Sequence, residues 1–182
     1  RSTARLIKMI KVPVIVAILK GMNLFHPRWS RKPRRTKLEV EYKIMLDQKQ
    51  VVELSEGEIY QKLLEYLHHD EVQYQKTHMN KIFSDKKAEH IGHALYVCPE
   101  CNAIDSFKSE GDDFICTKCS YDVHIDDYGF FERRTEGKLY FDNIRDWNIW
   151  QQKWLVDLVN EELNRNSTEV IFEDINSNVY HT

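Results

Sequence analysis

The four cysteines of this chain all belong to one pattern, C-x2-C followed after fourteen residues by a second C-x2-C. The pairs are Cys98–Cys101 and Cys116–Cys119. A two-residue spacing lets one tight turn direct two thiolates at the same ion, and two such turns complete a tetrahedron of sulfur ligands. The spacing therefore predicts that Cys98, Cys101, Cys116 and Cys119 bind one structural Zn²⁺ in a zinc ribbon.

The segment between the pairs supports this interpretation. Residues 104–115 have the pattern of a β-hairpin with its tip at 109–112. Asn102 and Ser120 follow the two pairs at positions where such turns commonly have Gly, and Asn tolerates the left-handed backbone better than Ser. A ribbon of this size has little core of its own, so we expect metal binding to supply much of its folding free energy. Four thiolates leave no open coordination position, so we expect no chemistry at the metal.

Two other interpretations of the cysteines are weaker. Two disulfides would suit a secreted chain, but no secretory signal is visible in the sequence. A dithiol redox site needs one such pair, and this chain has two. His124 could replace a cysteine as a ligand, but four thiolates already saturate the ion.

The N-terminal part predicts a helix followed by two strands. Ser2 or Thr3 can cap a helix that extends to Ile10. The run 12–19 is continuously apolar and rich in β-branched residues, which is typical of a parallel-sheet strand covered on both faces. Residues 37–46 alternate apolar and polar side chains, as a half-exposed edge strand does.

Helices are predicted for much of the remainder. A capping box at Ser55–Glu58 begins a helix that extends to about His69, and the polar segment 71–87 is also expected to be helical. A longer helix is predicted over 141–163, capped by Asp142 or Asn143. Its Trp147, Trp150 and Trp154 are expected to pack in a core or against the ribbon, in preference to forming a membrane-interface belt. The longest apolar run has eight residues, whereas a membrane-spanning helix needs roughly 20.

Charge is unevenly distributed along the chain. Residues 1–47 carry 12 Lys/Arg and 3 Asp/Glu, whereas the remainder carries 14 and 26. The basic part could face phosphate groups or an anionic membrane, and the acidic part argues against a nucleic-acid surface. Five basic residues crowd the loop between the two predicted strands: Arg28, Arg31, Lys32, Arg34 and Arg35.

Several stretches together resemble one protein family. Residues 11–17 read Lys-Val-Pro-Val-Ile-Val-Ala, which is similar to the last conserved block of the 1-acyl-sn-glycerol-3-phosphate acyltransferases, and residues 2–8 resemble the helix that leads into it. Downstream, Pro27-Arg28-Trp29, the ribbon, 128–132 and 141–147 resemble a bacterial subgroup with a zinc-ribbon extension. The order of these stretches is more specific than any one of them.

The resemblance implies transfer of a fatty acyl group from acyl-carrier protein or acyl-CoA to a lysophospholipid. The family's general base is the His of an H-x-x-x-x-D motif, which this sequence does not contain. No catalytic residue is therefore assigned, and we expect the chain alone to be inactive. The resemblance also implies a cytoplasmic protein at the inner face of the membrane, with the basic loop contacting lipid phosphate.

These observations predict an α+β chain, made of the C-terminal piece of an α/β acyltransferase domain (1–50), a helical connector (51–95), the ribbon (96–128) and a C-terminal hairpin and helix (129–182). Because the chain begins at Arg1 and ends after the strand-like run 169–171, we expect a fragment of a longer protein. The alternative is a zinc-ribbon module that recruits a partner. The acidic hairpin favours a protein over nucleic acid in that role.

Overall fold

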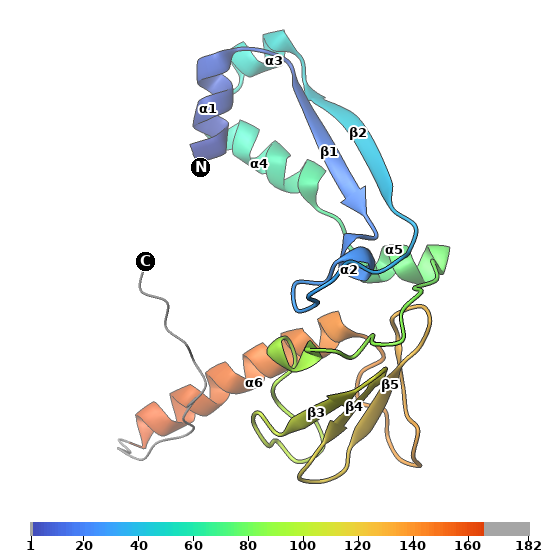
Figure 1. Cartoon of the computed structure of the whole chain (residues 1–182). Coiled ribbons are helices and arrows are strands. Elements are labelled where there is room, and N and C mark those ends of the chain that lie inside the picture. The colour runs from blue at the N-terminus through green and yellow to red at the C-terminus, as the bar shows by residue number, and fades with distance from the viewer. Residues whose placement is uncertain (1, 166–182) are drawn as a thin grey trace. The chain divides into compact units, whose positions relative to one another are not determined.

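The computed structural model describes residues 2–165, and these form two compact units (Figure 1). The first unit is Arg1–Ser84 and the second is Asp85–Thr182. The described residues have a mixed α/β fold with one small antiparallel sheet in each unit. The division falls within the 51–95 segment that the sequence assigns to a connector. The strand-like run 169–171 lies outside the described residues.

Three of the first unit's helices, α3 to α5, begin at local capping residues. Helix α1 is Ser2–Ile10, α2 is the single turn Met22–Phe25, α3 is Gln48–Glu53, α4 is Glu56–Leu67 and α5 is Glu71–His78. Asp47 and Ser55 each form a reciprocal capping box, with Gln50 and Glu58 respectively. The box at Ser55 was visible in the sequence, whereas α3 was not foreseen.

The predicted polar helix over 71–87 is shorter than expected. Asp70 caps α5 by accepting a hydrogen bond from the backbone N–H of Gln73. The helix ends at His78, and the next residue, Met79, caps it with a φ of 47° in the left-handed region. The helical part therefore covers only the first half of that segment.

Strands β1 (Val14–Lys20) and β2 (Glu39–Leu46) form the antiparallel sheet of the first unit. A bulge at the Val14 end leaves Met45 without a cross-strand partner, so that Met45 and Leu46 both turn into the core. Helices α1, α3 and α4 contribute the rest of that core. Its buried members are Ala4, Val16, Met45, Leu46, Val51, Ile59 and Leu63.

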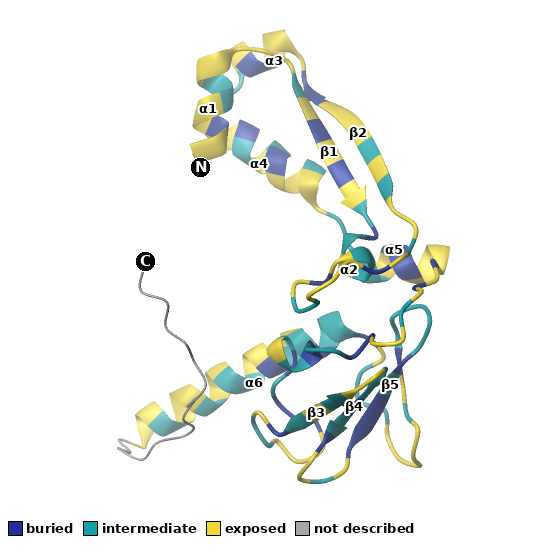
Figure 2. Cartoon of the chain, in the orientation of Figure 1, coloured by how far each residue is buried: buried dark blue, intermediate teal, exposed yellow. Residues whose placement is uncertain are grey.

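The structure contradicts the prediction that β1 is covered on both faces in a parallel sheet. Buried and exposed residues alternate along much of β1 (Figure 2). Val16 and Ile18 are buried, but Ile15 is 62% exposed and Leu19 47% exposed. On β2, whose apolar alternation suggested one buried face, Tyr42 and its apolar neighbours on the same face are exposed as well. A continuous apolar run shows that both faces of a strand are apolar, but it does not supply a covering layer for each of them.

The second unit is the ribbon and its helix. Strands β3 (Phe107–Glu110), β4 (Asp113–Cys116), β5 (Asp122–Ile125) and β6 (Phe131–Glu132) form an antiparallel meander. A single 3₁₀ turn, Ile91–His93, precedes them. Helix α6 (Ile144–Asn164) is capped by Asn143 and packs its N-terminal half on the sheet (Figure 1).

Trp147 of α6 is the centre of this unit. It is fully buried and makes ring contacts with five aromatic residues. These are Phe107, Phe114, Tyr121, Phe131 and Phe141, with ring centroids 5.6–6.0 Å from that of Trp147. The core on which the ribbon packs is therefore completed by α6, outside the predicted ribbon segment. None of the helices that the structure describes has the length and apolarity needed to cross a bilayer.

Candidate metal centre

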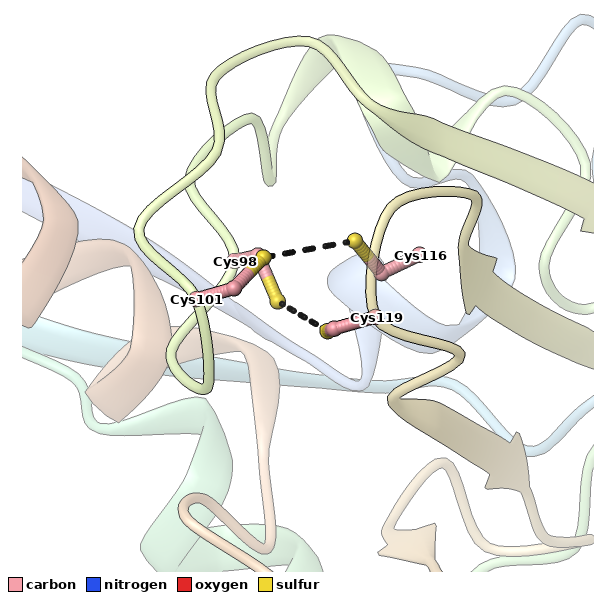
Figure 3. A group of neighbouring side chains, drawn as sticks. All are labelled: Cys98, Cys101, Cys116 and Cys119. Carbon is pink, nitrogen blue, oxygen red and sulfur yellow. Dashed lines mark hydrogen bonds between the residues drawn. The ribbon is translucent and has the colours of Figure 1, made fainter.

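Two short turns bring the four cysteine sulfurs together (Figure 3). The first turn carries Cys98 and Cys101 and is closed by a bridge between Val97 and Ile104. The second follows the end of β4 and carries Cys116 and Cys119. All four Sγ atoms lie within 4.8 Å of one another, so residues far apart in the sequence form one compact donor set.

The two turns have the same backbone geometry. The N–H of Asn102 donates to the carbonyl of Cys98, and the N–H of Ser120 donates to the carbonyl of Cys116, each at 2.9 Å. Asn102 has a φ of 58° and Ser120 a φ of 63°. Both residues therefore adopt the left-handed conformation that the sequence indicated from the usual preference for Gly at these positions.

The spacing of the sulfurs fits one tetrahedral metal ion. The Sγ atoms of Cys98 and Cys119 are 3.6 Å apart, and those of Cys101 and Cys116 are 3.8 Å apart. A tetrahedron with metal–sulfur bonds of about 2.3 Å has edges of about 3.8 Å. The four cysteines are free rather than disulfide-bonded. The cluster can thus hold one metal ion such as zinc.

The surroundings of the thiols differ from one another. Burial raises the pKa of the Cys98 thiol above its usual range. Burial also acts to raise the pKa of Cys116, but hydrogen bonds from the Ser106 hydroxyl and from the backbone N–H groups of Cys119 and Lys118 outweigh it and lower that pKa to about 7. These donors stabilise a thiolate, which is the form that binds metal.

Ser106, the residue directly before β3, contacts the second cysteine turn. Its hydroxyl lies 3.3 Å from the Cys116 sulfur, and its carbonyl accepts hydrogen bonds from both the N–H and the hydroxyl of Thr117. Cys98 and Cys116 are buried, whereas Cys101 is exposed. Two of the four cysteines are therefore enclosed by the protein, while Cys101 is accessible to solvent.

Helix α6 fixes the chain that leads into the first turn. The indole N–H of Trp147 donates to the carbonyl of Val97 at 3.0 Å. The fully buried Gln151 accepts from the N–H of Tyr96 at 2.9 Å and donates to the carbonyl of Ala94 at 2.6 Å. The sequence analysis missed Gln151, for which the only signal was a polar residue one turn after Trp147 on the buried side of the helix.

His124 lies on β5 and is not a member of the cysteine cluster. Its Nδ1 is 2.6 Å from a carboxylate oxygen of Asp113, and Arg134 contacts the same oxygen at 3.1 Å. This agrees with the expectation that four thiolates need no histidine.

The structure divides the five basic loop residues into two groups. Arg28, Arg31 and Lys32 are exposed. Arg34 is only 9% exposed, and its N–H donates to the carbonyl of Phe25 at 2.6 Å. The guanidinium of Arg35 lies over the ring of Phe83, 5.1 Å from its centroid. Arg35 is exposed as well, so Arg34 is the one buried member of the five.

Comparison with protein-family models, with curated proteins and with solved structures found no match for this chain.

Proposed function

We propose that the four-cysteine cluster holds one structural zinc ion and that the chain is the C-terminal part of a lysophospholipid acyltransferase-like protein. The observation that carries the first part is the set of four free sulfurs within 4.8 Å of one another, with two of the separations at 3.6 and 3.8 Å. Softness of the ligands favours zinc, because thiolates prefer it to hard cations such as Mg²⁺ or Ca²⁺. With all four positions filled by sulfur, the ion would cross-link the two turns and would not bind substrate.

The test of the zinc site is the metal content of the purified protein. Mass spectrometry of the intact chain under non-denaturing conditions should show one zinc per chain, and Cys116→Ser should abolish it. His124→Gln is the matched control, since this residue lies on β5 of the ribbon but outside the cysteine cluster, and the variant should keep its zinc. A zinc-free wild-type protein purified under reducing conditions would contradict the proposal.

The acyltransferase part rests on the order of the family-like stretches in the sequence. It is supported by the secondary structure, because the residues that resemble the family's leading helix lie in α1, and residues 14–17 of the block that resembles its last conserved strand lie in β1. In this role the exposed Arg28, Arg31 and Lys32 would contact lipid phosphate, with Arg34 and Arg35 supporting the loop. Acyl-carrier protein or acyl-CoA would be the acyl donor of the parent protein.

An activity comparison tests this second part. The complete product of the parent gene should transfer an acyl group to 1-acylglycerol-3-phosphate, and the 182-residue chain should not. The reason is that the chain lacks the H-x-x-x-x-D motif that would supply the general base. Activity of the 182-residue chain, or inactivity of the complete product with both donors, would overturn it.

A further inference from the structure

The four thiols of the cluster differ in how easily a reagent in solution can reach them. Cys98 is fully buried and Cys116 is 1% exposed, whereas Cys119 is half-buried and Cys101 is exposed. Cys101 is the middle residue of an exposed run, 100–102. Buried cysteines are inert, and reactive cysteines are those that reagents can reach. A reagent from solution is therefore expected to reach Cys101 before the other three thiols.

Two sulfur–sulfur contacts join the first cysteine turn to the second (Figure 3). The Sγ of Cys101 lies 3.8 Å from that of Cys116, and the Sγ of Cys98 lies 3.6 Å from that of Cys119. A disulfide bond is about 2.0 Å long, so each pair needs only a small approach to form one. Because all four cysteines of the chain belong to the cluster, any disulfide within one chain must join two of the metal ligands.

The buried partner of Cys101 is fixed by its surroundings. Cys116 is the last residue of β4, and its N–H donates to the carbonyl of Tyr121 at 2.8 Å. The hydroxyl of Ser106 lies 3.3 Å from its sulfur. A metal-bound thiolate carries no proton, so the hydroxyl is the donor in this contact. The thiolate is also the nucleophilic form of cysteine, which makes Cys116 a suitable second reactant once Cys101 has been modified.

We propose that the cluster is a modification site for hydrogen peroxide, at which Cys101 is oxidised first and Cys116 then forms a disulfide with it. In the first step the Cys101 thiolate attacks one peroxide oxygen, the O–O bond breaks, and a sulfenic acid and a hydroxide ion form. In the second step the Cys116 thiolate attacks the Cys101 sulfur, the S–S bond forms, the S–O bond breaks, and a second hydroxide ion leaves. The two sulfurs together lose two electrons, which the peroxide gains.

Oxidation of this pair removes two of the four thiolates that would bind the metal. Only the thiolate form of cysteine is a zinc ligand, so the site loses half of its donors and releases the ion. The new disulfide joins the same two turns that the ion joins. A thiol reductant together with zinc should restore the metal-bound form. The inference goes beyond the proposed structural role of the ion and rests on the zinc part of the proposed function.

The experiment treats the zinc-loaded 182-residue protein with hydrogen peroxide after its zinc content has been measured. A chromophoric zinc indicator follows release of the metal, and a dimedone probe labels sulfenic acids. Peptide mass spectrometry then locates the modifications, since trypsin cleaves after Lys118 and separates Cys116 from Cys119. Dimedone should label Cys101 first. Without dimedone, a disulfide between Cys101 and Cys116 should form in step with zinc release.

The control is the same treatment of protein unfolded in urea with a chelator, in which the four thiols should react without this order. First labelling at any cysteine other than Cys101 would overturn the inference. So would a first disulfide between two cysteines of the same turn, zinc that stays bound after the disulfide has formed, or the same order of labelling in urea. Wild-type protein that contains no zinc before peroxide is added would instead reject the zinc proposal, and the inference with it.

Discussion

The two sheets of the molecule have apolar faces of similar character but different surroundings. The sheet of the second unit is covered by α6, which places Trp147 among five aromatic rings. The sheet of the first unit is covered on one face by its helices and is open on the other. Apolar periodicity therefore identifies a face that favours burial, while the covering element has to be found separately.

The two units also differ in the sequence separation of the contacts that fix their helices and turns. In the first unit, local capping boxes at Asp47 and Ser55 fix the helices. In the second unit, contacts between residues distant in the sequence have this role. Gln151 accepts a hydrogen bond from the N–H of Tyr96, and the two cysteine turns lie side by side. We therefore expect the second unit to be the more sensitive to single substitutions.

The largest substitution effect is expected for Trp147→Ala. Truncating a fully buried tryptophan should lower the free energy of unfolding of the second unit by about 4 kcal/mol, through lost burial and the cavity left behind. Urea unfolding with zinc present measures it. Trp154→Ala on the same helix is the control and should cost much less, because Trp154 is only partly buried. Equal costs for the two would show that Trp147 is not the centre of the core.

A smaller effect separates the two faces of β1. Val16→Ala should lower the free energy of unfolding of the first unit by about 2 kcal/mol, because it removes two buried methyl groups. Ile15→Ala, one residue away on the open face, should change it by less than about 0.5 kcal/mol. Urea titration of both variants checks the difference. Similar costs would mean that the open face is covered in solution.

The smallest effect concerns the left-handed residues of the two cysteine turns. Ser120→Gly should raise the free energy of unfolding by roughly 1 kcal/mol, because glycine adopts a φ of 63° without steric cost. Asn102→Gly should gain only a few tenths of a kcal/mol, since Asn already tolerates this conformation. Thermal melting of the zinc-loaded variants gives both values. A lower melting temperature for Ser120→Gly would contradict the geometry of the second turn.

The sequence predicted features that depend on local chemistry. The capping box at Ser55, the Asn143 cap and the hairpin between the cysteine pairs each follow from residues a few positions apart. The four sulfurs also come together as expected, because two-residue spacing constrains each turn. Strands β5 and β6 were missed, since they have only four and two residues and their pairing is not encoded by a long apolar pattern.

Features that depend on distant partners were the difficult ones. The burial of β1 on one face only could not be read from a strand that is apolar on both. The burial of Arg34 and the stacking of Arg35 on Phe83 split a basic cluster that looked uniform. Gln151 is buried because distant backbone groups satisfy its amide, which no local pattern indicates.

The most direct test of the account is hydrogen exchange of the zinc-loaded protein before and after treatment with an excess of chelator. The account predicts that the amides of 96–125 lose their protection, because the ion cross-links the two cysteine turns, while those of α4 in the first unit keep theirs. Unchanged protection of 96–125 after complete removal of the metal would contradict the central claim that one zinc ion stabilises the ribbon.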